Sequence, residues 1–472
     1  MLNRKLFFNS LCFSFCLWLA SSCRIVEPPQ LPTAAQLPSS FEGSRDTISI
    51  GDLQWQDFFN DAYLVDLINL ALDNNLDLLS VAQNIEMARA NYEISRGALL
   101  PSVDMRFRGR TGNLTTPLLE NTVNGVHNIE NQTQNYFLGF QSFWEADLWG
   151  KLRNRRKAAY VRFLATERGR HLIHTNLVAE VARLYYELLG LDNELETIQK
   201  NIELQEIALE MIKIQKIGGR ATELAVQQFH AQLLRTQGLG IEKRQRIIEV
   251  ENQLNLLIGR FSQPIPRGES ILKQHLPEII RAGIPSDMLL RRPDVQQAEL
   301  QLLAAKADVE AARAEFLPSF TITPYAGLHT GQVTSIFNTP ESLIFGFITG
   351  VTAPIFLNNR IRAGYNQSVA RNMEAFYNYQ FTIITGYQEV VTSLNRVENY
   401  KQVYDFREQE TEVLLSAVST SNDLYFAGYA TYLEVITAQS RVLEAELSLL
   451  NTRKEIFLSL IDLYRALGGG WK

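Results

Sequence analysis

Histidine, cysteine and acidic side chains are the ones most able to bind a metal ion or take part in catalysis, and here they form no recognised catalytic motif. No HExxH, Walker loop or GxGxxG is present, and the six histidines are scattered along the chain: His127, His171, His174, His230, His275 and His329. His171 and His174 stand three residues apart on a predicted helix, but no third metal ligand stands nearby. We therefore expect no enzyme, no metal site and no cofactor.

Only one of the three cysteines is expected to remain in the mature chain. Arg4 and Lys5 precede an apolar stretch, 6–19, that is too short to span a bilayer comfortably, and this pattern is typical of a secretory signal peptide, here residues 1–22. Cleavage removes the other two cysteines and leaves Cys23 with no intramolecular partner.

The residues before Cys23 resemble a bacterial lipobox, in which small residues admit the peptidase and the cysteine thiol carries diacylglycerol. The match departs at Ala20, where the pattern has leucine, and an ordinary signal peptide cleaved nearby with a free thiol is the alternative. Arg24 in place of aspartate favours sorting of such a palmitate-bearing lipoprotein to the outer membrane. Residues 23–44, which contain four prolines, are then expected to form an extended tether.

Composition narrows the class of protein. The chain has 472 residues, of which 46% are hydrophobic and 20% charged, and this composition excludes a wholly disordered chain. A mean hydropathy of -0.10 excludes a bundle of membrane-spanning helices. The formal net charge of -6 argues against nucleic acid as a partner, because binding to the phosphate backbone requires the opposite sign.

Two long proline-free segments, 118–263 and 355–472, are predicted to hold the long helices. Apolar residues there recur at steps of three and four, which indicates coiled-coil seams: Leu195, Ile198, Ile202, Gln205, Leu209 and Ile212, then Leu433, Ile436, Ser440, Leu443, Leu447 and Leu450. The polar members, Gln205 and Ser440, are expected to hold the register of neighbouring helices. A continuous helix over 153–214 would be about 93 Å long, which suits a rod or a structure that crosses a compartment.

The sequence repeats itself once. Residues 77–102 recur at 294–319 with a constant offset, and the turn Gly219-Arg220-Ala221-Thr222 recurs as Gly428-Tyr429-Ala430-Thr431. We therefore divide the folded chain into repeat 1, 45–270, and repeat 2, 271–472. Each repeat is expected to contain a helix that ends at Leu-Pro-Ser, two strands, and two long helices joined at the Gly-x-Ala-Thr turn.

Four strands are predicted, at about 102–111, 136–148, 319–330 and 342–357. They are rich in aromatic residues and long enough to cross a bilayer as tilted strands, which takes roughly 9–11 residues. A four-stranded sheet in lipid would leave unpaired edges, and each unsatisfied backbone group there costs several kcal/mol. Other chains are therefore expected to complete a barrel.

Together these features resemble the outer membrane factors of tripartite efflux pumps, the TolC-like proteins, and specifically their lipidated NodT type. The resemblance covers almost the whole mature chain. It rests on the lipobox, the proline tether, the twofold repeat and the motifs at 55–78, 144–150, 291–294, 354–356 and 425–435. It implies a mixed α and β fold: a homotrimer in which four strands per chain make one 12-stranded β-barrel, continued by a long α-helical coiled-coil tunnel in the periplasm.

The function that the resemblance implies is a passive exit duct in the outer membrane. An inner-membrane transporter of the resistance-nodulation-division type and a periplasmic adaptor would drive substrate into it. The two Gly-x-Ala-Thr turns match the tips of the family that touch the adaptor: Gly219, Arg220, Ala221, Thr222, Gly428, Ala430 and Thr431. A hairpin turn without a partner is the alternative.

The family also implies a periplasmic gate after the second tip. Glu434 matches one gate acid, whereas Thr437 stands where the family has a second acid and Ala430 where it has arginine. We expect a cation-selective aperture, closed more by packing of Tyr425, Tyr429 and Tyr432 than by salt bridges. The alternative is that Glu434 is a solvated residue on the outside of the tube.

Three further interpretations stay open. The basic run from Lys151 to Lys157 suits either a membrane surface near lipid phosphates or a solvated helix face. A type I protein-secretion duct would use the same fold, and a surface structural coiled-coil lipoprotein would share the seams and the anchor. Arg292-Pro293-Asp294 is explained as a helix start with proline in the first turn.

Overall fold

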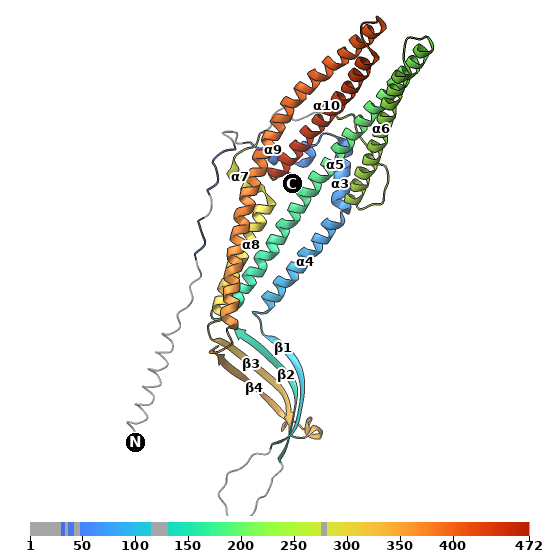
Figure 1. Ribbon diagram of the computed structural model, residues 1–472. Helices are drawn as coiled ribbons and strands as arrows, with labels where there is room; N and C mark the ends of the chain where they lie inside the picture. Colours follow the sequence, from blue (N-terminus) through green and yellow to red (C-terminus); the bar gives the residue numbers. More distant parts are fainter. Residues whose placement is uncertain (1–29, 34–35, 42–47, 115–130, 275–280, 472) are drawn as a thin grey trace, which may run out of the picture. The chain divides into compact units, whose positions relative to one another are not determined.

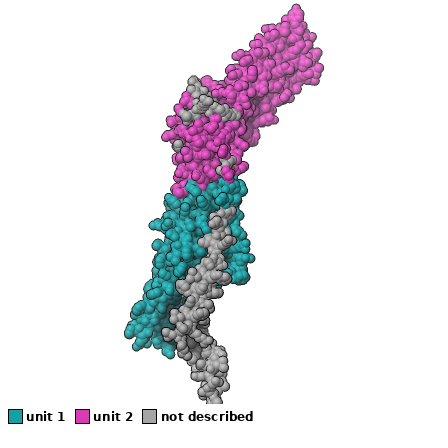
Figure 2. Space-filling model, turned by 90° about the vertical axis from the view of Figure 1, so that its left-hand side faces the viewer, with its two compact units in different colours: residues 1–32, 87–163, 300–377 teal, residues 33–86, 164–299, 378–472 magenta. Residues whose placement is uncertain are grey.

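The computed structural model describes residues 30–33, 36–41, 48–114, 131–274 and 281–471 (Figure 1). The chain divides into two compact units, coloured separately in Figure 2. Unit 1 contains Met87–Phe163 and Leu300–Tyr377, and unit 2 contains Thr33–Glu86, Leu164–Glu299 and Asn378–Lys472. Among the described residues, no helix combines the length and the apolar character that a membrane span requires.

Apart from the short helix α2 (Trp55–Phe58), the two halves of the chain contain corresponding elements in the same order. The first half has α2, α3 (Ala62–Asn74), α4 (Leu76–Gly97), β1 (Ser102–Leu114), β2 (Asn131–Ala146), α5 (Lys151–Ile217) and α6 (Glu223–Leu257). The second has α7 (Pro285–Arg291), α8 (Pro293–Ala314), β3 (Ser319–Thr330), β4 (Leu343–Thr352), α9 (Arg360–Phe426) and α10 (Tyr432–Ala466). Two short 3-10 helices, η1 (Ile50–Asp52) and η2 (Val333–Ser335), lie in the connections. The matching helices α5 and α9 have 67 residues each, and α6 and α10 have 35 each, so one helical hairpin is built twice.

Proline marks the boundaries of the helices that precede the sheet. Pro293 is the first residue of α8, where its missing N–H leaves no hydrogen bond unmade. Pro101 and Pro318 follow the ends of α4 and α8 and each precede a strand directly. Proline disfavours helical backbone at the residue before it, so neither helix continues into the strand.

The four strands form one antiparallel sheet in the order β1-β2-β3-β4 (Figure 1). Each strand follows its neighbour along the chain, and Phe107 pairs with Leu138, Leu138 with Leu328, and Leu328 with Leu343. Among the described strands, β1 and β4 therefore each keep one edge without a partner.

The largest core of unit 2 packs α3, the middle of α5, and the ends of α6 and α10. Its fully buried members include Leu64, Tyr185, Leu254 and Ile461. The Tyr185 hydroxyl donates to Asp61 Oδ2 at 2.7 Å and accepts from the Gly268 N–H at 2.9 Å. These bonds fix the segment that follows α6 against the core, since a buried polar group left unpaired costs about 1–3 kcal/mol.

Several predicted boundaries differ from the structure. The long helix expected over 153–214 runs from Lys151 to Ile217. The last strand ends at Thr352 rather than 357, so Ile355 and Phe356 lie outside the sheet. In the first seam Gln205, Leu209 and Ile212 are buried as expected, but Leu433 of the second seam is 56% exposed.

Candidate functional site

One face of the sheet is apolar across all four strands. Residues that pair directly across strands share a face, and one such row consists of Phe107, Leu138, Leu328 and Leu343. The next row consists of Met105, Phe140, Ala326 and Phe345, of which Met105 is 66% and Phe345 80% exposed in the single chain. A continuous exposed apolar band of this kind requires an apolar environment or a partner.

The opposite face of the sheet is mixed: its polar residues are concentrated on β1 and β3, whereas β2 and β4 place Phe143 and Ile348 there. In β1 the residues between the apolar ones are Asp104, Arg106 and Arg108, and Arg106 Nη2 bonds Asp104 Oδ2 at 3.1 Å. In β3 the corresponding residues include Thr321, Thr323 and His329. The sheet thus has one continuous apolar face and a second face whose charged residues lie on β1.

The two helical hairpins of unit 2 turn through the same backbone motif. At the first tip the Arg220 N–H bonds the Gln215 carbonyl (2.8 Å) and the Gly219 N–H bonds the Lys216 carbonyl (3.0 Å). At the second tip the Tyr429 N–H bonds the Leu424 carbonyl (2.9 Å) and the Gly428 N–H bonds the Tyr425 carbonyl (3.1 Å). This pair of bonds is a Schellman motif.

Glycine is required at each tip by backbone conformation. Gly219 has φ +73° and Gly428 has φ +83°, and no atom lies within 4 Å of where a Cβ would stand on either. The left-handed conformation therefore selects glycine, and the space around it is open. Arg220 is exposed beside Gly219, whereas Ala221 and Ala430 are half-buried against the helix ends.

A threonine after each turn begins the next helix. Thr222 Oγ1 accepts from the Ala225 N–H at 3.2 Å at the start of α6. At the start of α10, Glu434 replaces that alanine, and its carboxylate accepts from both the backbone N–H and the hydroxyl of Thr431. These hydrogen bonds hold the pKa of Glu434 below its ordinary value. Glu434 therefore has a capping role in the single chain, and its carboxylate is exposed.

The three tyrosines predicted at the gate lie differently. The Tyr425 hydroxyl donates to Gln215 Oε1 at 2.5 Å and joins α9 to α5. Tyr425 and Tyr432 both pack against a cluster that contains Phe229 and Val435. Tyr429 is 86% exposed at the turn, and Thr437 is exposed on α10. Tyr425 and Tyr432 thus pack against one apolar cluster, whereas the Tyr429 side chain is exposed.

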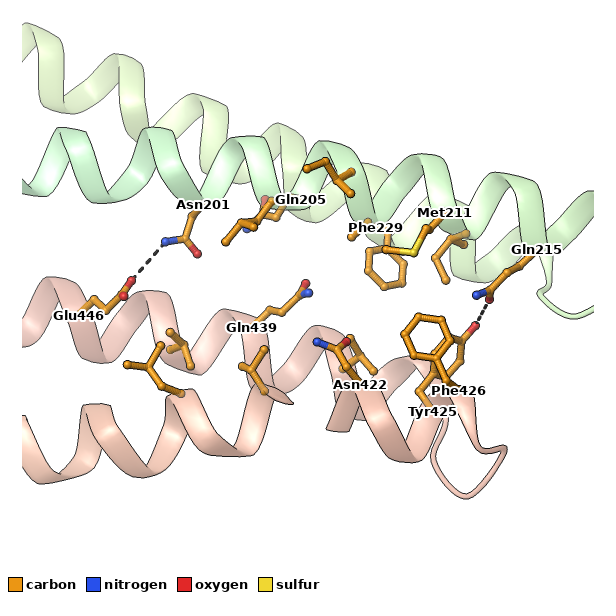
Figure 3. Close-up of a pocket in the computed structure, with 18 residues that line it drawn as sticks. Asn201, Gln205, Met211, Gln215, Phe229, Asn422, Tyr425, Phe426, Gln439 and Glu446 are labelled. Atoms are coloured by element: carbon orange, nitrogen blue, oxygen red, sulfur yellow. Dashed lines mark hydrogen bonds between the residues drawn. The ribbon is translucent and has the colours of Figure 1, made fainter. Parts of the chain in front are cut away.

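A groove lies between the two hairpins next to their tips (Figure 3). It has a volume of about 350 Å³ and is lined by α5, α6, α9 and α10. Its apolar members include Met211, Phe229 and Phe426, and its polar members include Gln205 and Glu446. We refer to it as the tip groove.

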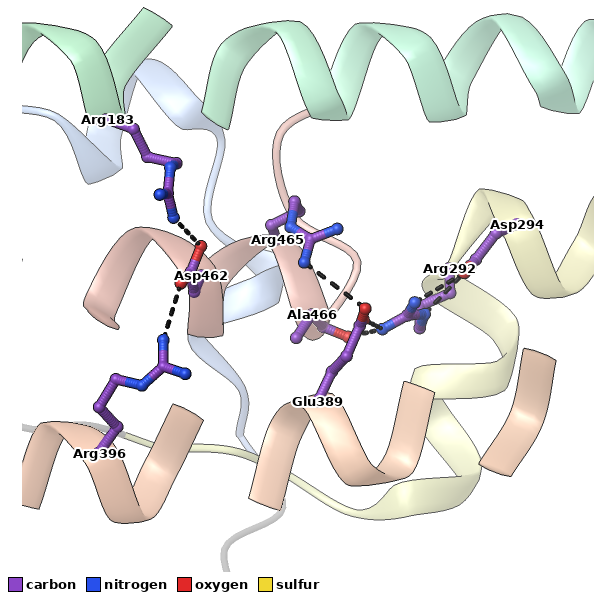
Figure 4. Close-up of polar contacts among 8 residues, drawn as sticks. All are labelled: Arg183, Arg292, Asp294, Glu389, Arg396, Asp462, Arg465 and Ala466. Atoms are coloured by element: carbon purple, nitrogen blue, oxygen red, sulfur yellow. Dashed lines mark hydrogen bonds and ion pairs between the residues drawn. The ribbon is translucent and has the colours of Figure 1, made fainter. Parts of the chain in front are cut away.

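A buried arginine links three helices of unit 2 (Figure 4). The Arg292 guanidinium makes two bonds to Asp294 (2.6 and 3.0 Å) and single bonds to Glu389 of α9 (2.8 Å) and the Ala466 carbonyl of α10 (2.9 Å). Arg292 is 6% exposed. Gly386 of α9 makes room for it, because a Cβ there would lie 3.1 Å from the guanidinium.

A second carboxylate lies nearby on α10. Asp462 accepts from Arg183 of α5 at 2.9 Å and from Arg396 of α9 at 3.2 Å (Figure 4). The sequence predicts Arg292 only as part of a helix start, and no local pattern marks Asp462. The glycine inside an otherwise long helix, Gly386, was the signal that a large side chain packs there.

The basic run at the start of α5 is largely neutralised within unit 1. Lys151 pairs with Glu145, Arg153 with Asp147 (3.2 Å), and Arg155 with Glu315. These pairs fasten the start of α5 to the end of β2 and the end of α8. Three of the five basic residues of this run thus have a carboxylate partner within unit 1.

The two histidines on α5 hold the C-terminal segment. His171 stacks on Trp471 with ring centroids 4.7 Å apart, and His174 Nδ1 lies 2.8 Å from the Gly470 carbonyl. Burial is the largest cause that lowers the pKa of both imidazoles. The predicted lipidation residue, Cys23, lies outside the described residues.

Comparison with known proteins gives a consistent picture. The family model described as outer membrane efflux protein matches residues 67–260 and 284–469. The chain is 29% identical over 465 residues to the solvent efflux pump outer membrane protein SrpC of Pseudomonas putida, with 97% of each chain covered. It is 26% identical to the probable outer membrane lipoprotein SilC of Salmonella typhimurium, with 96% of this chain and 97% of SilC covered. The open-state structure of the Neisseria gonorrhoeae MtrE outer membrane channel superposes with a TM-score of 0.81 at 26% identity, covering 94% of this chain and 98% of MtrE.

Proposed function

The chain belongs to the outer membrane efflux protein family, and we propose that it is the passive exit duct of a tripartite efflux pump. It is an outer membrane efflux channel, and the predicted family and mixed helix-and-strand channel fold are confirmed by the family match and the solved channel structures. The family consists of channels rather than enzymes. In the proposed pump an inner-membrane transporter, of the resistance-nodulation-division type, supplies the energy.

The main observation in support of the exit duct is the difference between the two faces of the sheet. Its apolar rows, such as Met105-Phe140-Ala326-Phe345, suit the lipid side of a barrel. The opposite face carries charged residues on β1 and suits a water-filled lumen. The edges of β1 and β4 have no partner strand in the described part of the chain. Three copies of the chain would pair these edges and give a 12-stranded barrel, in which no backbone group is left unpaired in lipid.

The periplasmic adaptor is proposed to contact the two hairpin tips. Nothing lies close to where a Cβ would stand on Gly219 or Gly428, so another helix end can approach the backbone at these two residues. Around them lie the other proposed contact residues: Arg220, Ala221, Thr222, Ala430 and Thr431. The identical turn geometry at both tips would offer the adaptor two equivalent positions per chain.

The gate is proposed to lie at the second tip. Its members are Tyr425, Tyr429, Tyr432, Glu434 and Thr437. In a trimer Glu434 would form a ring of three carboxylates, which attracts cations. The lowered pKa of Glu434 keeps this carboxylate charged under mildly acidic conditions.

Cys23 is proposed as the lipid anchor after cleavage of residues 1–22, with 23–44 as the tether and 45–270 and 271–472 as the two repeats. Loss of labelled fatty acid from a Cys23→Ser chain is the expected result. Persistent labelling would contradict the anchor but not the barrel, since the sheet holds the membrane independently.

Adjacent residues of β1 give a sharp test of the duct. Met105 and Arg106 lie on opposite faces of the sheet, so Met105→Cys should be shielded by lipid and Arg106→Cys exposed to the lumen. In outer membrane vesicles, a membrane-impermeant maleimide should label Arg106→Cys several-fold faster. Equal labelling at both positions would contradict a barrel with a lumen.

The partner class needs a separate measurement. Affinity purification of the tagged chain after cross-linking should recover an adaptor together with a proton-driven transporter. Recovery of an ATP-driven protein-secretion transporter would instead support the type I secretion duct, with the barrel labelling result unchanged.

A further inference from the structure

The tip groove contains a glutamine whose side chain has no partner. Gln205 of α5 is only 3% exposed, and neither its Nε2 nor its Oε1 has a hydrogen-bond partner among the described residues. Buried polar groups are nearly always hydrogen-bonded, because an unpaired one retains its desolvation penalty. Gln205 occupies a position where the heptad pattern calls for an apolar residue, so the sequence retains a polar group at a cost to packing.

A carboxylate lies on the opposite wall of the same groove. Glu446 of α10 is half-buried and accepts a hydrogen bond from Asn201 at 3.2 Å (Figure 3). It forms no ion pair with the lysines and arginines that the structure describes. The cation that acts on it from a distance, Lys200, is bound to Glu196 at 2.8 Å. The Glu446 carboxylate is therefore half-buried in the groove without a cation paired to it.

The rest of the groove is elongated and mainly apolar, with the amides of Asn422 and Gln439 among its lining side chains. Asn201 and Gln215, near its two ends on α5, are 14 residues apart, which corresponds to about 21 Å of helix. Between them, Ile207, Met211 and Phe426 are exposed by 60%, 43% and 64%. A volume of about 350 Å³ is within the range of small-molecule sites, which combine apolar walls with a few polar groups.

We propose that the tip groove binds an amphipathic organic cation. The cationic head would pair with Glu446, an amide, ester or amine group of the ligand would bond the Gln205 side chain, and the apolar body would lie along Met211, Phe229 and Phe426. Charge and shape complementarity select this class, because an anion would be repelled by Glu446 and a fully apolar molecule would leave Gln205 unpaired. All of the residues that line the site belong to one chain.

Rhodamine 6G is a suitable probe, because it carries a positive charge, an ester and N–H groups on a flat apolar ring system. Its fluorescence anisotropy should rise on titration with the purified full-length protein in a neutral detergent. Fluorescein, which shares the ring system but is anionic, should show no saturable binding. Saturable binding of both dyes would overturn the charge argument.

Two substitutions separate the contacts, and a third is the matched control. Glu446→Gln should weaken rhodamine 6G binding about tenfold, as expected for a charge-assisted contact, and Gln205→Leu about fivefold, as expected for a neutral hydrogen bond. Glu444→Gln removes a carboxylate two residues away on another face of α10 and should leave the affinity within about twofold. Thermal melting of each variant checks that it folds.

Unchanged affinity in both Glu446→Gln and Gln205→Leu would overturn the proposal, as would the absence of saturable rhodamine 6G binding to the native chain. An equal loss in Glu444→Gln would show that the dye responds to general charge and would also overturn it. None of these results bears on the exit duct, which the maleimide labelling of β1 tests separately.

Discussion

At the scale of single residues, Arg292 has a larger structural role than its sequence context predicts. The sequence indicates only a helix start, whereas the buried guanidinium bonds residues of three helices. Its guanidinium is shared by Asp294, Glu389 and the Ala466 carbonyl, so it joins the start of α8 to α9 and α10. Removing one member of a buried ion pair leaves the others desolvated and unpaired.

We expect Arg292→Met to destabilise the protein by about 3 kcal/mol. Arg396→Met is the control, because Arg396 also bonds an acid of α10 but its side chain is 44% exposed, and it should cost less than about 1 kcal/mol. Thermal melting in detergent, followed by tryptophan fluorescence, measures both. A smaller loss for Arg292→Met than for Arg396→Met would contradict the role of burial.

Glu434 has two roles that one substitution can separate. Glutamine still accepts the hydrogen bonds of a capping box but carries no charge. We therefore expect Glu434→Gln to keep the helix start while it weakens cation selectivity and block by multivalent cations in single-channel recordings. Unchanged selectivity would mean that the carboxylate does not line the pore.

The lowered pKa of Glu434 also sets a pH dependence. Hydrogen bonds from Thr431 favour the charged form, so the carboxylate should protonate only below the range of an ordinary glutamate. Cation selectivity should therefore persist when the pH is lowered from 7.5 to about 5. Its loss between these values would point to another titrating group.

At the scale of elements, the hairpin turns depend on a left-handed glycine. Gly428→Ala should destabilise the second tip by about 1–2 kcal/mol, since an L-residue is strained at φ +83° even where space is open. Gly238→Ala is the matched control: Gly238 lies inside α6 with nothing within 4 Å of its Cβ position, and alanine there should stabilise by about 0.5–1 kcal/mol.

Hydrogen exchange at the tip amides should report this difference, with faster exchange around residues 424–432 in Gly428→Ala and no such change in Gly238→Ala. Equal exchange in both variants would contradict a turn set by backbone conformation.

At the scale of the whole molecule, the free edges of β1 and β4 predict how copies meet. Ser102 begins β1 and Thr352 ends β4 at the same end of the sheet. A chain that carries both Val103→Cys and Val351→Cys should therefore be joined to its neighbours by a short bis-maleimide, and the ladder of products should end at three chains. Each single variant is the control and should give far less product. A ladder that ends at two chains would contradict the 12-stranded barrel.

What the sequence determined by itself was the local and periodic part of the structure. The repeat, the proline-free helices and the alternation of polar and apolar residues in Met105, Arg106 and Phe107 follow from near neighbours, whose effect does not depend on the rest of the fold. The Gly-x-Ala-Thr turns belong to the same class, because the need for positive φ is a property of a few consecutive residues.

Only the tertiary structure decided which distant residues meet. Arg292 and Glu389 are 97 positions apart, Tyr425 and Gln215 are 210 apart, and no local pattern states these pairs. Tertiary structure also decides the surroundings of Gln205. From the sequence alone, this residue is predicted only to hold the register of a coiled-coil seam. It became a candidate ligand contact only when packing placed its unpaired amide in the same groove as Glu446, because burial and hydrogen bonding depend on all the helices that surround a side chain.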